Sequence, residues 1–386
     1  MKHKLLIYAH QWAPTVGGVQ TVTMDLARGI CDWSNAHPDE AWEITLVTQT
    51  PANGMNDSVL PFRVLRRPSL AGLGRIIAAV DIVHLAGPSV FPLALATVMR
   101  KRIVVEHHGF QACCPNGLLF FEPSQSPCPG HFMAGRQSLC VECNRASMNL
   151  LRSLLLLAKT RARRWMCGLG VVNILPTAWL DTELRLKNTT TICHGVMASP
   201  LPPMPATPPL TIGFQGRLVS TKGVNLLLRA ASQLQAEGLD FRLKIIGDGP
   251  QKTALELQAR ELREGSVSFL GCVPPEQFEA ALADVSVVAV PSLGGEVFGL
   301  VVAENMLRSK ALVVSDIGSL AEVIGDAGLV VETGSVPALT EALRRLLSNP
   351  KLPSALGSTA RARALAVFRI EQMVRKHVDL YEKLIR

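Results

Sequence analysis

Short apolar runs alternate with amphipathic stretches along most of the chain, and each run has the length of a buried strand. In the first half, this pattern predicts strands at residues 4–9, 42–48, 81–85, 102–107, 170–175 and 189–193. Helices are expected between them, at residues 18–31, 88–99 and 177–185. Such alternation is typical of a doubly wound parallel sheet with helices on both faces, whose ligands gather at the carboxyl ends of the strands.

The same alternation restarts after a proline-rich stretch at residues 199–209, which holds six prolines and favours a stiff, extended connector. Strands are then expected at residues 210–214, 241–246, 267–270, 285–290, 312–314 and 329–331. Helices are expected at residues 223–237, 252–264 and 297–308. We therefore predict an α/β protein with two Rossmann-like domains, at 1–199 and 210–368, joined by a linker at 200–209.

Composition places the chain among globular proteins. Its 386 residues include 48% hydrophobic and 18% charged residues, and no apolar run approaches the roughly 18 residues that a membrane-spanning helix needs. The start, MKHKLLIYAH, reads as a first buried strand and not as a secretory signal. The odd number of cysteines, nine, suits a reducing compartment, so we expect a cytoplasmic protein.

The net charge of +8 is uneven, because residues 1–200 carry +7 of it. Within that half, residues 145–180 contain no acidic residue and place six basic residues beside Leu154–Leu157: Arg145, Arg152, Lys159, Arg161, Arg163 and Arg164. This combination favours contact with an anionic membrane surface. A helix with a buried leucine face and a solvated basic face fits the pattern equally well. Nucleic acid is not expected as a partner, since no recognisable binding module is present.

Two loops of the first half carry candidate chemistry. Gly17 and Gly18 lead into a helix, where backbone amides can approach an anion closely, although tight turns use the same residues. His107 and His108 end a strand, and the one beside Gly109, His108, is our candidate for polar contact with a substrate. We expect the other histidine to be a structural core residue.

Residues 110–146 interrupt the alternation and hold five of the nine cysteines. The Cys140-Val-Glu-Cys143 spacing lets two thiolates bind one zinc ion, with Cys114 and Cys128 as the remaining ligands. This predicts a structural zinc site in an insertion at about 110–146. The alternative is that these cysteines are reduced, unligated thiols in a flap on the acceptor side.

In the second half, Arg217 and Lys222 flank the entry to the first helix, where they can grip a diphosphate from two sides. A later strand ends at Gly247. Glu296 and Glu304 frame the expected start of another helix, whose early amides, those of Phe298, Gly299 and Leu300, can receive an anion. Taken alone, this stretch favours a simpler interpretation, in which Glu296 caps the helix and Glu304 is a solvated surface residue.

Several motifs are missing from the sequence. There is no Walker loop and no Gly-x-Gly-x-x-Gly after either first strand, which disfavours nucleotide triphosphatases and dehydrogenases. No Asp-x-Asp pair offers a carboxylate clamp for a magnesium-bound nucleotide diphosphate. Cationic side chains and helix amides would therefore have to neutralise phosphate without a metal.

Taken together, the motifs resemble those of the family 4 retaining glycosyltransferases, also called glycosyl transferases group 1, which have the two-Rossmann-domain GT-B architecture. The resemblance covers nearly the whole chain and rests on six motifs in order: Gly17-Gly18, His108-Gly109, residues 191–196 (TICHGV), Gly216-Arg217 through Lys222-Gly223, residues 246–250 (IGDGP) and Glu296-x7-Glu304. His194 stands where that family often has asparagine.

This resemblance implies roles for most of these residues. Arg217 and Lys222 would hold the donor diphosphate, Glu304 the ribose hydroxyls and Glu296 the transferred sugar. The amides of Gly299, Leu300 and Val301 would contact sugar or phosphate, Gly17 and Gly18 would cover the diphosphate, and His108 would meet the donor sugar near the reacting centre. Transfer would need no metal cofactor, and a final helix within 369–386 would pack back on the first domain.

The expected activity is therefore transfer of a sugar from a UDP- or GDP-sugar to a glycan or a lipid-linked acceptor, by a protein peripheral to the inner face of the cell membrane. The missing enzymic nucleophile favours a same-face displacement. Two other functions remain open: a GT-B sugar-nucleotide epimerase, and a catalytically silent protein that binds nucleotide sugars. The E-x7-E pair with Arg217 and Lys222 favours the transferase.

Overall fold

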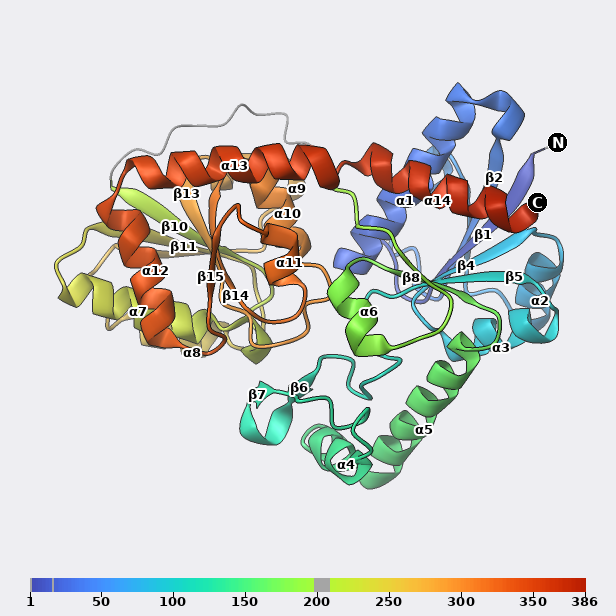
Figure 1. Cartoon of the computed structure of the whole chain (residues 1–386), viewed down its shortest axis with the longest axis horizontal. Helices are drawn as coiled ribbons and strands as arrows, with labels where there is room; N and C mark the ends of the chain where they lie inside the picture. Colours follow the sequence, from blue (N-terminus) through green and yellow to red (C-terminus); the bar gives the residue numbers. More distant parts are fainter. Residues whose placement is uncertain (1, 16, 198–208) are drawn as a thin grey trace. The chain divides into compact units, whose positions relative to one another are not determined.

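The computed structural model describes residues 2–15, 17–197 and 209–386, so most of the linker predicted at 200–209 lies outside the described residues. The chain divides into two compact units. The first consists of residues 1–123, 129–196 and 369–386, and the second of residues 124–128 and 197–368. Each unit is built around its own parallel sheet (Figure 1).

The first unit has a seven-stranded sheet in the order β3-β2-β1-β4-β5-β8-β9. Its strands are β1 (His3–Ala9), β2 (Trp42–Thr48), β3 (Arg63–Arg66), β4 (Ile82–Ala86), β5 (Arg102–Glu106), β8 (Val172–Leu175) and β9 (Thr189–Thr191), all paired in parallel. Central strand β1 is buried without alternation from Leu5 onward, as expected for a parallel strand covered on both faces. The edge strand β3 was not predicted, because its sequence, RVLR, has no apolar run.

The helices of the first unit are α1 (Gly18–Ala36), α2 (Leu70–Ala78), α3 (Val90–Val98), α4 (Gln137–Arg145), α5 (Leu150–Cys167), α6 (Ala178–Leu184) and α14 (Ile370–Ile385). The last of these, α14, lies against α1, drawn in blue in Figure 1. The two helices are so close that a Cβ atom added at Gly29 of α1 would lie 2.3 Å from Cγ2 of Val374 in α14. The chain's last helix is thus part of the core of the first unit.

The second unit has a six-stranded parallel sheet in the order β12-β11-β10-β13-β14-β15. Its strands are β10 (Leu210–Gln215), β11 (Phe241–Ile246), β12 (Val267–Gly271), β13 (Val285–Val290), β14 (Ala311–Ser315) and β15 (Leu329–Val331). Its helices are α7 (Val224–Ala236), α8 (Lys252–Ala259), α9 (Pro275–Leu282), α10 (Leu300–Leu307), α11 (Leu320–Ile324), α12 (Val336–Ser348) and α13 (Lys351–Val367). Two doubly wound parallel sheets confirm the predicted fold class.

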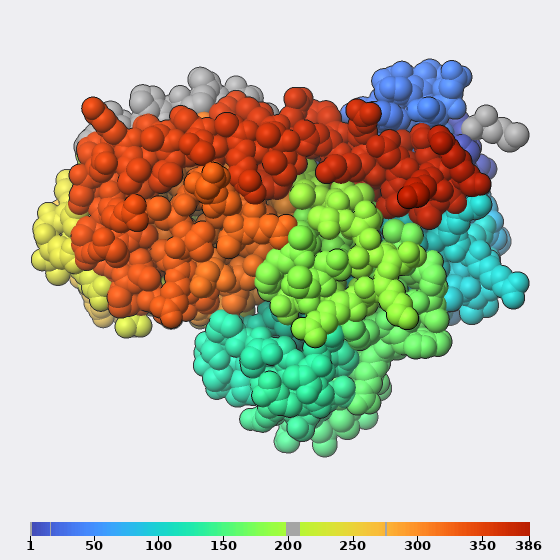
Figure 2. Space-filling view, in the orientation of Figure 1, coloured from blue at the N-terminus to red at the C-terminus, as the bar shows by residue number. Residues whose placement is uncertain are grey.

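One predicted helix start was wrong, and the cysteine-rich segment contains regular structure. The helix expected at 297–308 begins only at Leu300, because Gly299 has a φ of 85°, a left-handed conformation that a helix cannot continue through. The cysteine-rich segment is not a loop throughout: after the short strands β6 (Phe120–Phe121) and β7 (Ser126–Pro127) it enters α4, which carries Cys140 and Cys143. With α5 this segment forms a lobe of the surface, teal to green in Figure 2.

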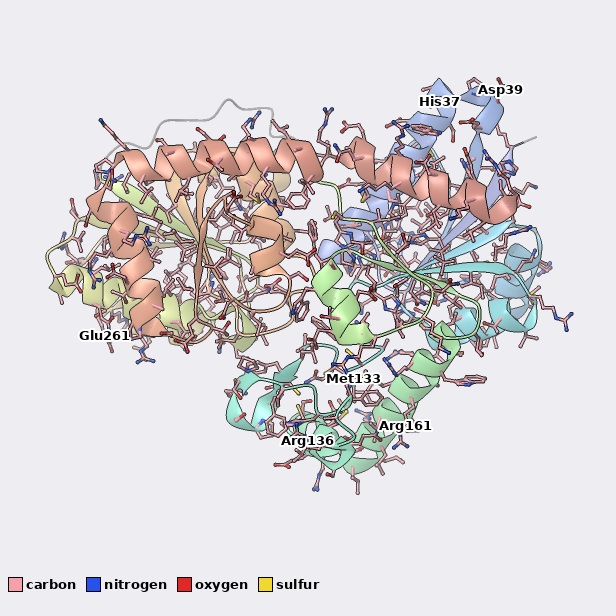
Figure 3. The ribbon with its side chains drawn as sticks, viewed as in Figure 1. His37, Asp39, Met133, Arg136, Arg161 and Glu261 are labelled. Carbon is pink, nitrogen blue, oxygen red and sulfur yellow. The ribbon has the colours of Figure 1, made fainter. Side chains whose placement is uncertain are left out.

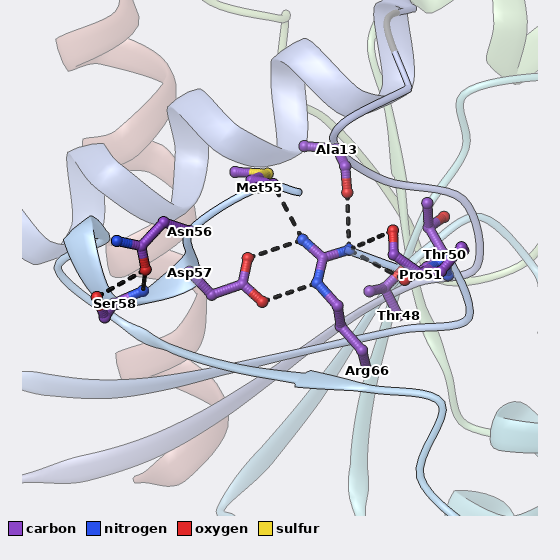
Figure 4. A network of polar contacts seen from close by, with 9 residues as sticks. All are labelled: Ala13, Thr48, Thr50, Pro51, Met55, Asn56, Asp57, Ser58 and Arg66. Carbon is purple, nitrogen blue, oxygen red and sulfur yellow. Dashed lines mark hydrogen bonds and ion pairs between the residues drawn. The ribbon is translucent and has the colours of Figure 1, made fainter. Parts of the chain in front are cut away.

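Arg66 organises the loops beside β2 (Figure 4). Its guanidinium binds both carboxylate oxygens of Asp57, at 2.7 and 2.8 Å. It also donates to the backbone oxygens of Ala13 and Thr50, at 2.8 and 3.0 Å. One buried cation therefore fixes the loop that follows β1, four residues before Gly17.

Candidate functional site

The loops at the carboxyl ends of β10, β11, β13 and β14 carry most of the candidate residues of the second unit. β10 and β13 are neighbours, and the chain leaves them in opposite directions across the sheet, so a topological switch point lies between them. In open parallel sheets, ligands bind in the crevice at this point. Arg217 and Lys222 follow β10, and Glu296 follows β13.

Lys222 and Glu296 meet directly. Nζ of Lys222 donates to Oε1 of Glu296 at 2.5 Å, and the hydroxyl of Ser292 donates to the same oxygen at 2.7 Å. Glu296 keeps 9% of its side-chain exposure and Lys222 keeps 30%. The pair is thus a mostly buried carboxylate bound to a lysine that reaches solvent.

Tight backbone contacts hold these two loops together. The amide of Leu293 donates to the oxygen of Thr221 at 2.7 Å. Gly223 has a φ of 65°, and a Cβ there would lie 1.9 Å from the oxygen of Pro291. Only glycine fits this turn. Gly223 therefore allows the loop that carries Lys222 to pack closely against the loop that carries Glu296.

Two of the amides predicted to bind an anion, those of Leu300 and Val301, lie at the start of α10. Leu300 and Val301 are the first residues of α10, whereas the amides of Val302 and Ala303 already donate to Gly299. Phe298 is 1% exposed and its ring packs edge-on against Phe368, so its side chain belongs to the core. The amides of Leu300 and Val301, the first of α10, are therefore in position to bind an anion.

Glu304 lies about one turn inside α10, which begins at Leu300. Nε2 of Gln215 donates to its carboxylate at 3.3 Å, while Oε1 of Gln215 accepts from Asn305 at 3.0 Å. Burial raises the pKa of Glu304, although Arg308, 3.8 Å away, and Gln215 act in the opposite direction. A hydroxyl donor that approached Glu304 would restore the hydrogen bonding that burial removes.

Arg217 and Gly247 belong to two loops that touch. A Cβ at Gly247 would lie 1.9 Å from the oxygen of Gly216, and the amide of Leu218 donates to Asp248 at 2.9 Å. The Arg217 side chain is exposed and forms no ion pair with any residue that the structure describes. Gly247 thus acts through packing, and Arg217 is left available for an anionic ligand.

The candidate residues of the first unit lie after β1 and β5. Gly17 is the N-cap of α1 with extended backbone, and Gly18 is the first helical residue. His107 is fully buried, with Nε2 2.9 Å from Oδ1 of Asn173, and burial lowers its pKa to about 4, so it is the structural histidine of the pair. The His108 ring keeps 6% exposure, and its Nε2 lies 3.6 Å from Glu106.

Glu106 was not predicted as a site residue, although it ends β5. Burial alone would raise its pKa, but attraction from His108 and hydrogen bonding with His108 and His194 outweigh burial and hold the pKa well below its usual range. The ring of His194 stacks on that of His108, with 4.9 Å between centroids. His108 therefore has a fixed orientation, and no local sequence signal joins these residues.

The predicted zinc ligands have distinct surroundings. Cys114 donates to Oδ1 of Asn116 at 2.9 Å, and Nδ2 of Asn116 donates to Sγ of Cys143 at 3.4 Å, so these two thiols converge on one side chain. Cys140 is buried beside Phe132 and Leu157. Cys128 is partly exposed.

The basic stretch forms α5, and its leucine face is largely exposed. Four leucines, Leu150, Leu151, Leu154 and Leu155, keep 46–67% of their exposure, and Trp165 keeps 67%. They share one side of the helix by their spacing. Within the run Leu154–Leu157, only Leu157 is buried. The alternative of a buried leucine face is therefore wrong.

The basic residues of α5 divide into two groups. Arg163 donates to the oxygen of Pro88 at 3.1 Å, Arg164 to that of Leu184 at 2.6 Å, and Arg161 (Figure 3) to Gln137 of α4. Arg152 and Lys159 are exposed. No helix within the described residues has the length and apolar character needed to cross a membrane.

Comparison with known proteins identifies the second unit. Residues 204–363, about two fifths of the chain, match the model of the family "Glycosyl transferases group 1". Among curated relatives, the chain is 32% identical to alpha-D-kanosaminyltransferase of Streptomyces kanamyceticus over 38% of this chain and 39% of the relative. It is 35% identical to phosphatidyl-myo-inositol mannosyltransferase of Mycolicibacterium smegmatis over 39% of each. The match thus spans about two fifths of the relatives' length.

Solved structures extend the similarity to the whole fold. Sucrose-phosphate synthase from Thermosynechococcus elongatus superposes with a TM-score of 0.73 at 17% identity, covering 99% of both chains. HepE from Anabaena, in a complex with UDP-glucose, gives a TM-score of 0.69 at 17% identity, covering 98% of this chain and 99% of that one. The fold is accordingly GT-B, as the sequence motifs implied.

Sequence reasoning missed three polar residues that support the site. The hydroxyl of Ser292 donates to the carboxylate of Glu296, and the amide of Gln215 donates to that of Glu304. The backbone amide of Ser319 donates to the backbone oxygen of Glu296 at 3.2 Å. Ser292 lies four residues before Glu296, and Gln215 is the last residue of β10. Both positions follow from the rule that ligand-binding side chains cluster at carboxyl ends of strands.

Proposed function

We propose that this protein is a retaining glycosyltransferase that moves a sugar from a nucleotide-diphosphate sugar to a glycan or a lipid-linked acceptor. The Lys222–Glu296 pair at the switch point of the second sheet carries this proposal, because it joins a cation to a hydroxyl-binding carboxylate. The group 1 domain at 204–363 and the fold shared with a UDP-glucose complex support it.

The residues divide the work by the charge that develops. As the nucleotide diphosphate leaves, negative charge grows on its oxygen, and Arg217, Lys222 and the amides of Leu300 and Val301 stabilise it. Glu296 would accept hydrogen bonds from hydroxyls of the transferred sugar, and Glu304 from those of the ribose. Gly17 and Gly18 would offer amides to the diphosphate, and His108 would meet the sugar beside the reacting carbon.

A same-face displacement accounts for retention without an enzymic nucleophile. Glu296 already accepts from Lys222 and Ser292, so its carboxylate is held for binding and is poorly placed to attack. Mass spectrometry of protein quenched during turnover should find unmodified chain. A covalent sugar on any side chain would contradict this mechanism.

We propose that transfer needs no metal, since the sequence has no Asp-x-Asp clamp and cationic side chains can neutralise the diphosphate. Turnover in a strong chelator should then equal turnover with added Mg²⁺. A requirement for Mg²⁺ that scales with its concentration would refute metal independence while leaving the transferase assignment intact.

The donor can be found by thermal shift, because a ligand that binds only the folded protein raises its stability. UDP-, GDP- and ADP-sugars should be screened at equal concentrations. We expect one nucleotide class to raise the Tm of wild type, and the shift to fall in Lys222→Ala. An equal shift in Lys222→Ala would mean that the nucleotide binds elsewhere.

The two competing functions give different results in the same assay. An epimerase converts the donor without any acceptor, and a silent binder shows a thermal shift but neither hydrolyses nor transfers any donor. A transferase releases the nucleoside diphosphate slowly on its own and faster when an acceptor is added. Nuclear magnetic resonance of the sugar before and after incubation distinguishes all three.

We propose that α5 binds the inner face of the cell membrane, which would place the protein, cytoplasmic and peripheral, beside lipid-linked acceptors. The exposed leucines and Trp165 supply apolar area for the headgroup region, and Arg152 and Lys159 attract anionic lipid. The arginines at 161, 163 and 164 contribute less, because other parts of the chain already bind them.

Vesicles with and without anionic phosphatidylglycerol test this surface by co-sedimentation. Wild type should prefer anionic vesicles, and Leu151→Ser with Leu155→Ser, or Arg152→Gln with Lys159→Gln, should lose most of the binding. Leu257→Ser is the matched control, since Leu257 is 63% exposed on α8. Binding that persists in both double variants would disprove the role of α5.

We also propose that Cys114, Cys128, Cys140 and Cys143 hold a structural zinc ion. This proposal is supported by the positions of Cys114 and Cys143, which both contact the side chain of Asn116 and so lie near each other. Metal analysis should then find zinc in wild type and less in Cys140→Ser with Cys143→Ser. Equal metal in both proteins would leave these cysteines as reduced thiols.

A further inference from the structure

Glu106 lies at the centre of a buried group of histidines within the first unit. Its carboxylate is 1% exposed, and ring nitrogens of His84, His108 and His377 lie 3.2, 3.6 and 3.7 Å from the same oxygen, Oε2. His84 comes from β4 and His377 from α14, and both are at most 1% exposed. No lysine or arginine forms an ion pair with Glu106 among the described residues.

The protonation of His377 follows from its other ring nitrogen. Nδ1 lies 2.9 Å from the backbone oxygen of Met373, which can only accept, so Nδ1 carries a hydrogen. In the neutral ring, Nε2 then presents a lone pair to Oε2 of Glu106. Nε2 is fully buried and has no hydrogen-bond partner. Two acceptors facing each other in a dry interior need a cation between them.

The distances favour a metal ion over a shared proton. A hydrogen bond between imidazolium and carboxylate would bring the two atoms to about 2.7–2.9 Å. Nε2 of His377 is 3.7 Å from Oε2, beyond hydrogen-bond distance, whereas Nε2 of His84, 3.2 Å from it, is at the long end of the hydrogen-bond range. Two ligands of a tetrahedral zinc ion, each bound at about 2.1 Å, lie about 3.4 Å apart. The separations of both histidines bracket this value.

Both histidines also have the outer contacts typical of metal ligands. A ligating histidine usually donates its second N–H to an oxygen, which fixes the ring and makes the ligand more basic. His377 does so to Met373, and Nδ1 of His84 lies 2.7 Å from the hydroxyl of Tyr381, which can accept from it. Tyr381 is itself fully buried on α14.

We propose that His84, Glu106 and His377 bind one Zn²⁺ ion that attaches α14 to the sheet of the first unit. The three ligand atoms lie within 4.8 Å of one another, and the set of two imidazoles and one carboxylate suits zinc. The metal joins strands β4 and β5 to the last helix of the chain. This inference is independent of the proposed transferase activity and of the cysteine site.

The test is the metal content of full-length protein purified without a metal-affinity column. To remove the thiolate site, the measurement uses the Cys140→Ser, Cys143→Ser chain. We expect about one equivalent of zinc there, and a loss of at least tenfold after adding Glu106→Gln or His377→Gln. His107→Gln is the matched control, because His107 is equally buried but bonded to Asn173, and it should keep the metal.

Cobalt substitution gives a second measurement that does not need the cluster variants to fold. Wild type treated with a chelator and shown by circular dichroism to be folded is titrated with Co²⁺. Uptake at this site gives weak visible bands without thiolate-to-cobalt charge transfer, and its removal with chelator lowers the Tm.

Three results would overturn the proposal. The first is wild type that contains no stoichiometric metal and takes up no Co²⁺. The second is Co²⁺ bound with a thiolate spectrum alone, and the third is zinc that a folded His377→Gln chain retains in full.

Discussion

Glu106 and Glu296 occupy similar places in two similar sheets but have opposite surroundings. Glu106 ends one buried parallel strand and Glu296 follows another. Among the described residues Glu106 forms ion pairs only with imidazoles and is closed off from solvent, whereas Glu296 meets a lysine that is 30% exposed. A carboxylate enclosed by four histidines, from β4, α14 and two loops, can hold a fixed partner. A carboxylate beside a lysine that reaches solvent can exchange its partner for a ligand.

The comparison predicts that substitution of Glu106 lowers the stability of the protein much more than substitution of Glu296 does. Glu106→Gln removes the charge that several buried rings face, and breaking a buried ionic group costs about 3–5 kcal/mol. Glu296→Gln leaves Lys222 able to turn toward water, so it should cost less than about 1.5 kcal/mol. Urea denaturation of both variants measures this difference. Equal losses would mean that Glu296 is as structural as Glu106.

Lys222→Ala should have the largest effect on activity. Removing one preorganised electrostatic contact from a developing anion lowers kcat about 100- to 1000-fold. Lys222→Arg keeps the charge but cannot reproduce the 2.5 Å contact with Glu296, so we expect partial recovery. Initial rates with the donor found by thermal shift measure both. A loss confined to KM would assign Lys222 to ground-state binding alone.

The sequence predicted the part of the molecule whose signals lie close together along the chain. The strands β2, β11, β13 and β15 have the predicted bounds, because each is a short apolar run between turns. Lys222 and Glu296 could be proposed because each belongs to a motif at a strand's end. The start of α10 was placed too early, since Gly299 looks like any helix residue until its φ of 85° is known.

The histidine cluster could not be predicted for a different reason. Tyr381 and His84 are 297 residues apart, and their hydrogen bond forms only when α14 returns to the first sheet. Within its own helix, His377 resembles any core residue of α14. The terminal helix was expected to pack back, but its polar contacts depend on its rotation about its axis, which periodicity alone does not fix.

Glu304→Gln should weaken donor binding and stabilise the free protein. Loss of charged hydrogen bonds to ribose, worth about 1.5–3 kcal/mol, should reduce affinity about 10- to 100-fold. Because burial raises the pKa of Glu304 above the ordinary value of 4.5, the folded state loses stability as pH rises from 4.5 to the raised pKa. The Tm of Glu304→Gln should therefore exceed that of wild type at pH 7 and match it below the ordinary value of 4.5.

Calorimetry at several pH values, with and without the nucleotide, measures both effects of Glu304→Gln. Asn305→Ala serves as the control, since it disturbs the same Gln215 side chain without removing a titrating group. A variant that binds the donor as tightly as wild type would contradict the ribose contact, and a Tm difference that does not change with pH would contradict the effect of burial.

Asp57→Asn should give the smallest effect and test an ion pair outside both glutamate sites. Hydrogen bonds from Arg66 hold the pKa of Asp57 below 3.8, so the pair stabilises the folded state above about pH 4, and this contribution is lost as pH falls through the lowered pKa. We expect a cost of about 1–2 kcal/mol at pH 7 that shrinks toward zero in acid.

Since Arg66 also holds the oxygen of Ala13, the variant should loosen the loop before Gly17 and raise KM for the donor modestly. A cost that is constant from pH 3 to pH 7 would show that the amide disturbs packing and that the charge of Asp57 is not what holds this loop.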